Sequence, residues 1–268
     1  MNTFQNNSNC TRASDSLLHI QLNSIRGLLM SERFFALSIA GGRGERLRPL
    51  TDNRPKPMIK INGKPIIGYQ VDWMRAQGVT DVVFLCGYKG EMIQQYFGDG
   101  SEYGISAHYS FEDSPLGRGG ALKKGLSLVP ADTNIVLVSN GDIITNQSIA
   151  PIAELHEKSN ATGTIMLVPY PSQFGVVESN DQSVVTQFIE KGSLPFWINA
   201  GVYLFDRQIE SLLPDIGDHE TTTFQELAKQ GKLSSYHSDM AWTSIESPKD
   251  LNDITDHIRD GRLTLASI

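Results

Sequence analysis

Short apolar runs alternate with amphipathic stretches along the chain from Phe34 onward. The apolar runs have the length of buried strands, and in the stretches between them apolar residues recur with the spacing of one helical face. The predicted strands cover residues 34–40, 81–87, 105–110, 135–140, 162–169 and 202–205. The predicted helices cover residues 67–77, 91–97, 120–128, 149–159 and 248–259. This alternation predicts an α/β fold with a mostly parallel, Rossmann-like open sheet and helices on both faces.

Residues 1–32 differ in composition from the rest of the chain. They are rich in Asn, Ser and Thr and contain one weakly amphipathic stretch at residues 17–29. We interpret them as an N-terminal extension, disordered or partly helical, that precedes a single domain at residues 33–268. Met30 stands just before the first predicted strand and is an alternative translation start; a docking helix within the extension is the other interpretation.

The overall composition excludes several classes of function. The formal net charge of −7 argues against a nucleic-acid binder, because such proteins need surplus Lys and Arg to displace counterions from a phosphate backbone. Cys10 and Cys86 form no CxxC or Cys/His pattern, so neither a disulfide framework nor a zinc site is expected, and a cytoplasmic location fits best. No apolar run approaches the roughly 20 residues that span a bilayer, so no membrane association is expected.

The chemistry-bearing residues gather where strands are predicted to end. In an open α/β sheet, ligands bind beyond the carboxyl ends of the strands. The first predicted strand ends in a loop with Gly41, Gly42 and Gly44, and glycines there let backbone N–H groups approach an anion. Although the chain is acidic overall, this loop and the residues after it are rich in cations: Arg43, Arg46, Arg48, Arg54, Lys56 and Lys60. The local reversal of charge predicts a polyanionic ligand or a set of ion pairs.

Other glycine loops that bind phosphates fit less well. Gly42-x-Gly44-x-x-Leu47 lacks the third glycine of a dinucleotide fingerprint, and Pro49 and Pro55 prevent a helix from following it. No Gly-Lys-Ser/Thr closes a P-loop. A purely structural glycine turn would explain the glycines but not the density of Arg and Lys.

The motif as a whole, Gly-Gly-x-Gly-x-Arg-Leu-x-Pro-Leu-Thr followed by Pro-Lys-Pro, resembles the signature of the sugar-1-phosphate nucleotidylyltransferase family. The resemblance implies the nucleotide-diphospho-sugar transferase fold. It also implies that Arg46 binds the β- and γ-phosphates of a nucleoside triphosphate and that Lys56 contacts the phosphates at the reacting centre. The residues it implies for nucleotide binding in the loop are Ala40, Gly41, Gly42 and Gly44.

The strand predicted at residues 135–140 ends in Gly141 and Asp142. An Asp at this edge either holds Mg²⁺ together with substrate phosphates or caps the turn before the helix predicted at residues 149–159. The resemblance favours the metal, because the family carries its metal-binding Asp in the same strand-end Gly-Asp. It therefore implies Mg²⁺ as the cofactor and Asp142 as a catalytic metal ligand.

A second glycine-rich loop, Glu112-x-x-Pro-Leu-Gly117, leads into a predicted helix and offers a wall for a nucleobase and ribose. It resembles the family's base-recognition segment, which implies that Glu112 and Gly117 bind the nucleotide.

Three later segments, at residues 174–177, 188–191 and 199–203, match the family in order. By that resemblance the residues that face the sugar are Gly175, Glu190 and Asn199, and Lys191 contacts the sugar phosphate. Chemically, a Glu can accept hydrogen bonds from two sugar hydroxyls, and a Lys offers a point charge to a phosphate.

One departure concerns the metal. The family usually reads Trp-x-Asp-Ile-Gly-Thr-Pro near its C-terminus, with the Asp completing the metal site, but here Ser244 stands at the position of the Asp. A hydroxyl replaces a carboxylate, so the second metal ligand is open, and Asp239 and Glu246 are candidates to substitute.

The sequence thus predicts transfer of a nucleoside monophosphate from a triphosphate to a sugar-1-phosphate, with release of pyrophosphate. The segment that begins at Glu112 is more similar to that of guanylyl- and some uridylyl-transferring members than to that of the thymidylyl type, which favours GTP with mannose- or heptose-1-phosphate. UTP with glucose-1-phosphate is the alternative substrate pair. A non-catalytic nucleotide-sugar-binding subunit, suggested by Ser244, is the alternative of another class. A role in polysaccharide biosynthesis is expected, and a homo-oligomer is compatible with the sequence.

Overall fold

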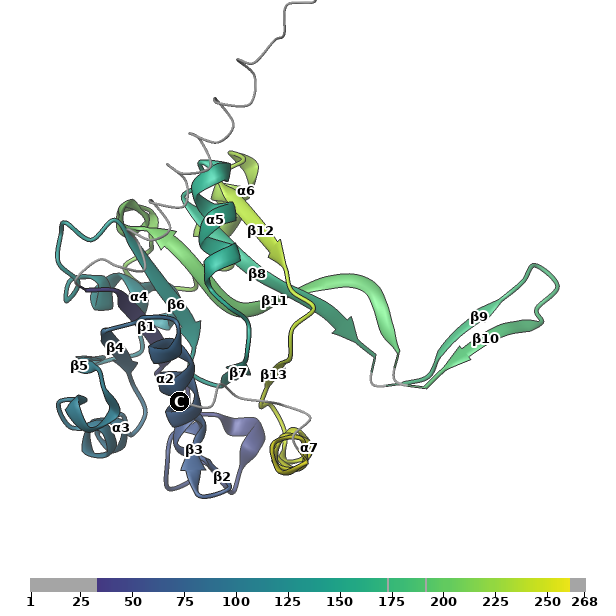
Figure 1. Ribbon diagram of the computed structural model, residues 1–268, viewed down its shortest axis with the longest axis horizontal. Helices are drawn as coiled ribbons and strands as arrows, with labels where there is room; N and C mark the ends of the chain where they lie inside the picture. Colours follow the sequence, from purple (N-terminus) through teal and green to yellow (C-terminus); the bar gives the residue numbers. More distant parts are fainter. Residues whose placement is uncertain (1–32, 173, 191, 261–268) are drawn as a thin grey trace, which may run out of the picture.

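A seven-stranded mixed sheet forms the centre of the computed structural model, which describes residues 33–172, 174–190 and 192–260 (Figure 1). The strand order is β12-β8-β11-β6-β1-β4-β5. These strands are β1 (Phe35–Ala40), β4 (Asp81–Cys86), β5 (Ser106–Phe111), β6 (Ile135–Asn140), β8 (Gly163–Pro171), β11 (Ser193–Asp206) and β12 (Leu233–His237). Only β11 runs antiparallel to its neighbours in this sheet. The predicted mostly parallel α/β sheet is confirmed.

Helices cover both faces of the sheet because its central strands are apolar on both sides. Ala36 and Phe84 belong to one core cluster, together with residues of α2 (Ile66–Ala76), α3 (Glu91–Phe97) and α5 (Ala150–Ser159). Their strand neighbours Leu37 and Leu85 belong to a second cluster, together with residues of α4 (Gly117–Leu126), the 3-10 helix η4 (Arg207–Leu212) and α6 (Thr223–Lys229). Strand side chains alternate between faces, so one apolar run supplies two cores.

A third, smaller core lies beyond the carboxyl edge of the sheet. Its residues lie in or directly next to η1 (Glu45–Leu47), η2 (Lys56–Met58), β2 (Lys60–Ile61), β3 (Lys64–Pro65), β7 (Ile143–Thr145), β13 (Trp242–Ser244) and α7 (Pro248–Arg259), and the start of α2 adds Ile66. Leu47, Ile144 and Ile245 are among its fully buried members. The remaining 3-10 helix, η3 (Ser101–Tyr103), follows α3.

A two-stranded ribbon projects away from this body (Figure 1). We call residues 174–190 the arm; it consists of β9 (Val176–Ser179) and β10 (Val185–Ile189) with their flanking residues. Its apolar side chains are open to solvent, with Phe174 79% and Phe188 64% exposed.

The predicted strands and helices match elements of the structure with shifted ends, most clearly at the strand predicted at residues 202–205, which is the end of the much longer β11. The described elements that the periodicity does not predict are the short strands β2, β3, β7 and β13, the edge strand β12, α6, the four 3-10 helices and the arm. The stretch at residues 17–29 lies outside the described residues, so the division into extension and domain stays a prediction.

Candidate active site

Two cavities lie side by side at the carboxyl end of β1, the first next to the end of β6 and the second next to the ends of β4 and β5. The first cavity, of about 460 Å³, contains Gly44, Arg46, Lys56, Asp142 and Glu246 in its wall. The second cavity, of about 440 Å³, contains Gly41, Arg43, Glu112 and Gly117. Both share Ile39, Gly42 and Arg118, so they are two parts of one cleft.

The glycine loop after β1 lies against the backbone of the next parallel strand. β1 pairs in register with β4, which places Gly41 beside Gly87, and Tyr88 donates a backbone hydrogen bond to the Gly41 carbonyl at 3.1 Å. A Cβ on Gly87 would lie 2.6 Å from the Gly41 oxygen, a contact that the backbone cannot relieve without moving. Gly44 adopts a positive φ of +62°, and a Cβ there would lie 2.8 Å from Lys56 Cβ. Glycine at these positions therefore allows the loop to pack close to the lysine that follows it.

Four charged side chains converge in the first cavity. Lys56 Nζ lies 2.5 Å from Asp142 Oδ2 and 3.0 Å from Glu246 Oε1, and Arg46 Nη2 lies 3.2 Å from Glu246 Oε2. The side chains of Lys56 and Asp142 are only 12% and 19% exposed. Charges in such a partly enclosed place interact more strongly than on an open surface, because less water screens them.

The third core brings these side chains together from distant parts of the sequence. Leu47, next to Arg46, and Ile245, next to Glu246, are both fully buried in it. β13 pairs antiparallel with β7 so that Ser244 lies opposite Ile143, and the Ile245 N–H donates to the Asp142 carbonyl at 3.3 Å. The C-terminal segment is thereby held beside the end of β6.

The wall of the second cavity is built around a carboxylate. The Leu116 N–H donates to Glu112 Oε2 at 3.0 Å, which holds this side chain at the turn before α4. Gly117 has a φ of +73°, and a Cβ there would lie 2.5 Å from the Gly217 carbonyl oxygen. The loop before α6 therefore packs directly on the start of α4, and Gly217 accepts a hydrogen bond from the Gly119 N–H at 2.9 Å.

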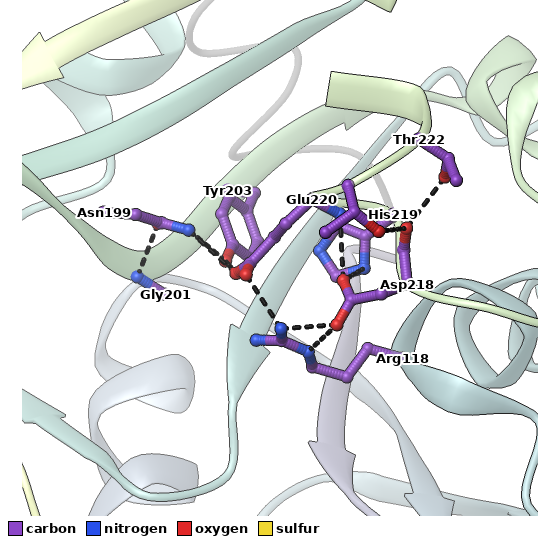
Figure 2. A network of polar contacts seen from close by, with 9 residues as sticks. Arg118, Asn199, Gly201, Tyr203, Asp218, His219, Glu220 and Thr222 are labelled. Carbon is purple, nitrogen blue, oxygen red and sulfur yellow. Dashed lines mark hydrogen bonds and ion pairs between the residues drawn. The ribbon is translucent and has the colours of Figure 1, made fainter. Parts of the chain in front are cut away.

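A polar network links the cleft to β11 (Figure 2). Arg118, which lines both cavities, donates from Nε to Asp218 Oδ2 at 2.8 Å and contacts Glu220 Oε2 at 2.8 Å. Glu220 Oε1 accepts from Asn199 Nδ2 at 3.0 Å and from the Tyr203 hydroxyl at 3.3 Å. The Asn199 side-chain oxygen in turn accepts from the Gly201 N–H at 2.9 Å.

Sequence reasoning did not assign a role to Arg118. The available signal was a cation inside a second glycine-rich loop, Leu116-Gly117-Arg118-Gly119-Gly120. Its partners Asp218 and Glu220 carried no motif and could not be found from the sequence alone. Desolvation opposes the charged form of Arg118, but its hydrogen bonds with Asp218 and the charge of Glu220 outweigh this and raise its pKa. The guanidinium therefore stays charged at the junction of the two cavities.

Buried His219 lies behind this network. Its side chain is fully buried, it packs edge-on against Tyr203 and Phe224, and neither ring nitrogen hydrogen-bonds to another described residue. Burial lowers the pKa of His219 to about 4; the charge of Asp218 opposes this lowering, and the charge of Arg118 adds a smaller one. The ring is therefore neutral near pH 7.

The predicted site residues fall into three groups. Those that line the first cavity are Ala40, Gly42, Gly44, Arg46, Lys56 and Asp142. Those that line the second cavity are Gly41, Gly42, Glu112 and Gly117. Of the residues predicted to contact the sugar phosphate, Gly175, Glu190 and Asn199 line neither cavity: Asn199 is joined to Arg118 through Glu220, and the other two lie on the arm. The fourth, Lys191, lies outside the described residues.

The first cavity offers oxygen ligands to a hard cation. The carboxylates of Asp142 and Glu246 both reach the one ammonium of Lys56, and the Ser244 hydroxyl donates to Glu246 Oε1 at 3.2 Å. Nowhere in residues 33–172, 174–190 and 192–260 do three or more His, Cys, Asp or Glu side chains gather into a metal-binding group. The two carboxylates of Asp142 and Glu246 are groups that could hold Mg²⁺, which commonly takes one or two carboxylates and completes its shell with water and substrate phosphates. Among the described helices, none combines the length and apolar character required to cross a bilayer.

Comparison with known proteins identifies relatives of this chain. The Nucleotidyl transferase family matches residues 36–261. A mannose-1-phosphate guanyltransferase of Yarrowia lipolytica is 36% identical over 223 residues, which cover 80% of this chain and 61% of that protein. A mannose-1-phosphate guanylyltransferase of Mycobacterium tuberculosis is 32% identical over 223 residues, covering 80% of this chain and 62% of that protein. The chain thus spans somewhat less than two thirds of the length of these curated relatives.

Solved structures show the same fold at lower sequence identity. HddC from Yersinia pseudotuberculosis superposes with a TM-score of 0.68 at 23% identity, covering 84% of this chain and 99% of that chain. A structure of HddC complexed with GMP-PN gives a TM-score of 0.66 at 22% identity over 84% of this chain and 99% of that one.

Proposed function

This chain belongs to the nucleotidyl transferase family, and we propose from that membership and from the cleft that it is a sugar-1-phosphate nucleotidylyltransferase. The proposed reaction transfers GMP from GTP to mannose-1-phosphate or a related sugar-1-phosphate and releases pyrophosphate. The named activity of the relatives at 36% and 32% identity supports this substrate pair over UTP with glucose-1-phosphate.

The observation that carries the proposal is the first cavity, where a glycine loop, two cations and a strand-end carboxylate share one wall. Attack by a sugar-phosphate oxygen on the α-phosphorus brings two polyanions together, and like charges a few ångströms apart repel by about 1 kcal/mol per pair in water and by more in a drier site. Arg46 and Lys56 offset this repulsion and align the phosphates for in-line displacement. The attacking phosphate is already ionised, so neither a general base nor a covalent nucleophile is required.

Mg²⁺ is the proposed cofactor, with Asp142 as its ligand from the protein. When bound, it neutralises charge on the phosphate oxygens of the triphosphate. Around it, Lys56 lies 2.5 Å from the same carboxylate, so this lysine and the metal would act on the same phosphates.

The second cavity is the proposed site for the base and ribose. Glu112 lines it, and because its Oε2 is engaged by the Leu116 N–H, Oε1 is the oxygen left to accept from the base. Guanine presents N–H groups from which a carboxylate can accept hydrogen bonds, which agrees with a preference for GTP.

The sugar-phosphate contacts proposed from the sequence remain Gly175, Glu190, Lys191 and Asn199. Asn199 is the best supported of them, because Glu220 ties it to Arg118 at the cleft. We further propose that the product supplies polysaccharide biosynthesis and that the enzyme acts in the cytoplasm.

Pyrophosphate release tests the proposal. Purified protein is assayed with each combination of GTP or UTP and mannose-, heptose- or glucose-1-phosphate in the presence of Mg²⁺. We expect GTP with mannose- or heptose-1-phosphate to give the highest kcat/KM. Lys56→Ala and Asp142→Asn should each lower kcat by about 10²–10³, the range for losing a preorganised electrostatic group.

Lys60→Ala is the matched control, because Lys60 belongs to the same basic stretch but is exposed and does not line either cavity. Its kcat should stay within about twofold of the wild-type value, as for other exposed positions. Release of no pyrophosphate from any pair, or near-normal turnover in Lys56→Ala, would refute the proposal.

A further inference from the structure

Two carboxylates in the first cavity share a single ammonium. Lys56 Nζ lies 2.5 Å from Asp142 Oδ2 and 3.0 Å from Glu246 Oε1. The position between the two carboxylates is therefore where this cavity most favours positive charge.

We infer that Glu246, and not Ser244, supplies the second carboxylate of the divalent-cation site, and that Lys56 occupies the cation's position until the cation binds. The inference rests on the proposed function, since it concerns the metal of that reaction. It assigns to this chain a metal ligand two residues beyond the position where the resemblance places one.

The local backbone explains how a carboxylate that lies two residues further along the sequence can still reach the cavity. Ser244 and Glu246 flank Ile245, which is fully buried in the third core and fixes this segment. In extended chain, residues two apart project to the same side. Both therefore lie on the side away from the third core, and the Ser244 hydroxyl donates to Glu246 Oε1 at 3.2 Å. Glu246 is the one that lines the cavity with Asp142.

Of the two oxygens of Glu246, Oε1 is the one that would bind a cation once Lys56 has left it. Arg46 Nη2 takes Oε2 at 3.2 Å, while Oε1 faces Lys56 and the Ser244 hydroxyl. The backbone N–H of Glu246 donates to Asp250 Oδ2 at 3.0 Å, the same carboxylate oxygen that caps α7 from its first turn. The start of α7 thus holds Glu246 in place, and Arg46 orients its carboxylate.

The charges of these groups indicate what happens to Lys56 when a divalent cation binds. Two carboxylates and one ammonium leave this group of three with one net negative charge, and a divalent cation in place of the ammonium would bring that charge to zero. Because a bound Mg²⁺ and a lysine ammonium repel each other at contact distance, cation binding releases Lys56 from Asp142 and Glu246. The freed ammonium is still in the wall of the first cavity, where a triphosphate would meet it.

Direct binding of Mn²⁺ to the intact chain tests both halves of the inference without turnover. Bound and free Mn²⁺ are separated by electron paramagnetic resonance, in the absence of nucleotide, for the wild type and four variants. Glu246→Gln and Asp142→Asn should each weaken Mn²⁺ binding about 10-fold or more, at least the loss that is typical of removing an outer-shell partner of a metal ligand. Ser244→Ala, the comparison variant, should weaken Mn²⁺ binding less than Glu246→Gln does, because the Ser244 hydroxyl contacts the ligand Glu246 and leaves both carboxylates in place.

Lys56→Met gives the discriminating result. If this lysine competes with the cation, its removal should tighten Mn²⁺ binding severalfold, although the same change abolishes turnover under the proposed function. If the lysine instead supports the cation site, its removal should weaken Mn²⁺ binding. Thermal unfolding of every variant checks that the fold is retained, and circular dichroism compares the folded states.

The inference is overturned by wild-type Mn²⁺ affinity in Glu246→Gln, by a loss in Ser244→Ala equal to that in Glu246→Gln, by weaker binding in Lys56→Met, or by wild-type protein that takes up no Mn²⁺. If only the proposed function fails, the expected order of Mn²⁺ affinities among the variants should still be found, while no substrate pair releases pyrophosphate.

Discussion

The cleft and the arm are both recognised from sequence motifs, but only the cleft assembles into a site within the described residues. Arg46, Lys56 and Asp142 come from three separate segments and line one cavity. Gly175 and Glu190 come from motifs of the same family and line neither cavity. A motif therefore assigns a role by resemblance, whereas packing decides whether the residue is held in position to perform it.

Packing is what separates the two regions. The cleft stands on parallel strands that are buried on both faces, and the carboxyl ends of such strands meet at one edge. The arm is a ribbon of two strands, an arrangement that is marginally stable by itself. Phe84 in β4 is fully buried, whereas Phe188 in the arm is 64% exposed.

The largest effect is expected in the sheet under the cleft. Phe84 stacks on Phe97 at 4.8 Å and on Tyr109 at 5.6 Å between ring centroids. Phe84→Ala should lower the free energy of unfolding by about 3–5 kcal/mol, because it removes a buried ring and leaves a cavity. Urea denaturation at pH 7 measures this loss of unfolding free energy, with Phe84→Leu as the milder control. A loss under about 1 kcal/mol, the typical cost of an ordinary substitution, would show that the sheet does not carry the stability of this region.

The next largest effect is on the stability of the protein in acid, and it comes from His219, which lies behind the polar network. His219 is neutral in the folded protein with a pKa of about 4, while in the unfolded chain a histidine titrates near pH 6.5. The unfolded state therefore binds the proton first as the pH falls, so this residue lowers stability between about pH 6.5 and pH 4. The full contribution is about 3 kcal/mol, of which about 2 kcal/mol appears by pH 5.

Urea denaturation at pH 7 and pH 5 measures the loss, with His219→Phe as the comparison. Phe fills the aromatic pocket formed with Tyr203 and Phe224 and does not titrate. The pH 7 to pH 5 loss should be about 2 kcal/mol smaller in the variant. An equal loss in both proteins would mean that His219 does not resist protonation.

Most of the fold can be predicted from sequence pattern, because fully apolar strands and amphipathic helices each have a distinct signal. β1, β4, β6, α3 and α7 lie within about one residue of their predicted ends. The elements that were missed lack such a signal. β12, with the sequence Leu-Ser-Ser-Tyr-His, is half-buried at the sheet edge, and β13 has only three residues. Their positions are set by tertiary pairing with β8 and β7.

The candidate site divides in the same way. The residues of the cleft walls could be predicted because they belong to ordered motifs at strand ends. Asp218 and Glu220 could not, because they belong to a loop that meets Arg118 only through the packing of Gly217 on the start of α4. Glu246 could be named as a candidate, but its contact with Lys56 depends on β13 pairing with β7.

Arg118 tests whether the network acts on the cleft. Arg118→Met should weaken GTP binding by about 1.5–3 kcal/mol, the range for losing a hydrogen bond to a charged group. The substitution also leaves Asp218 and Glu220 beside the cleft without their cation. Isothermal titration with a non-hydrolysable GTP analogue measures this. Lys123→Met is the control, because Lys123 is in the same helix but pairs with the exposed Asp215. Equal affinities in both variants would make the network structural only.

The smallest effect is expected on the arm. The ring of Phe188 covers Gly175, where a Cβ would meet its Cζ at 2.6 Å, yet the ring is largely open to solvent on its other side. Phe188→Ser should change the free energy of unfolding by no more than about 0.5 kcal/mol, as for other exposed positions, and should leave GTP binding unchanged. If Gly175 and Glu190 contact the sugar, the KM for the sugar-1-phosphate should rise, because the uncovered ribbon no longer holds these residues in place. A loss of unfolding free energy comparable to that of Phe84→Ala would instead mean that the arm is packed in solution as firmly as the sheet, and the contrast between the two regions would fail.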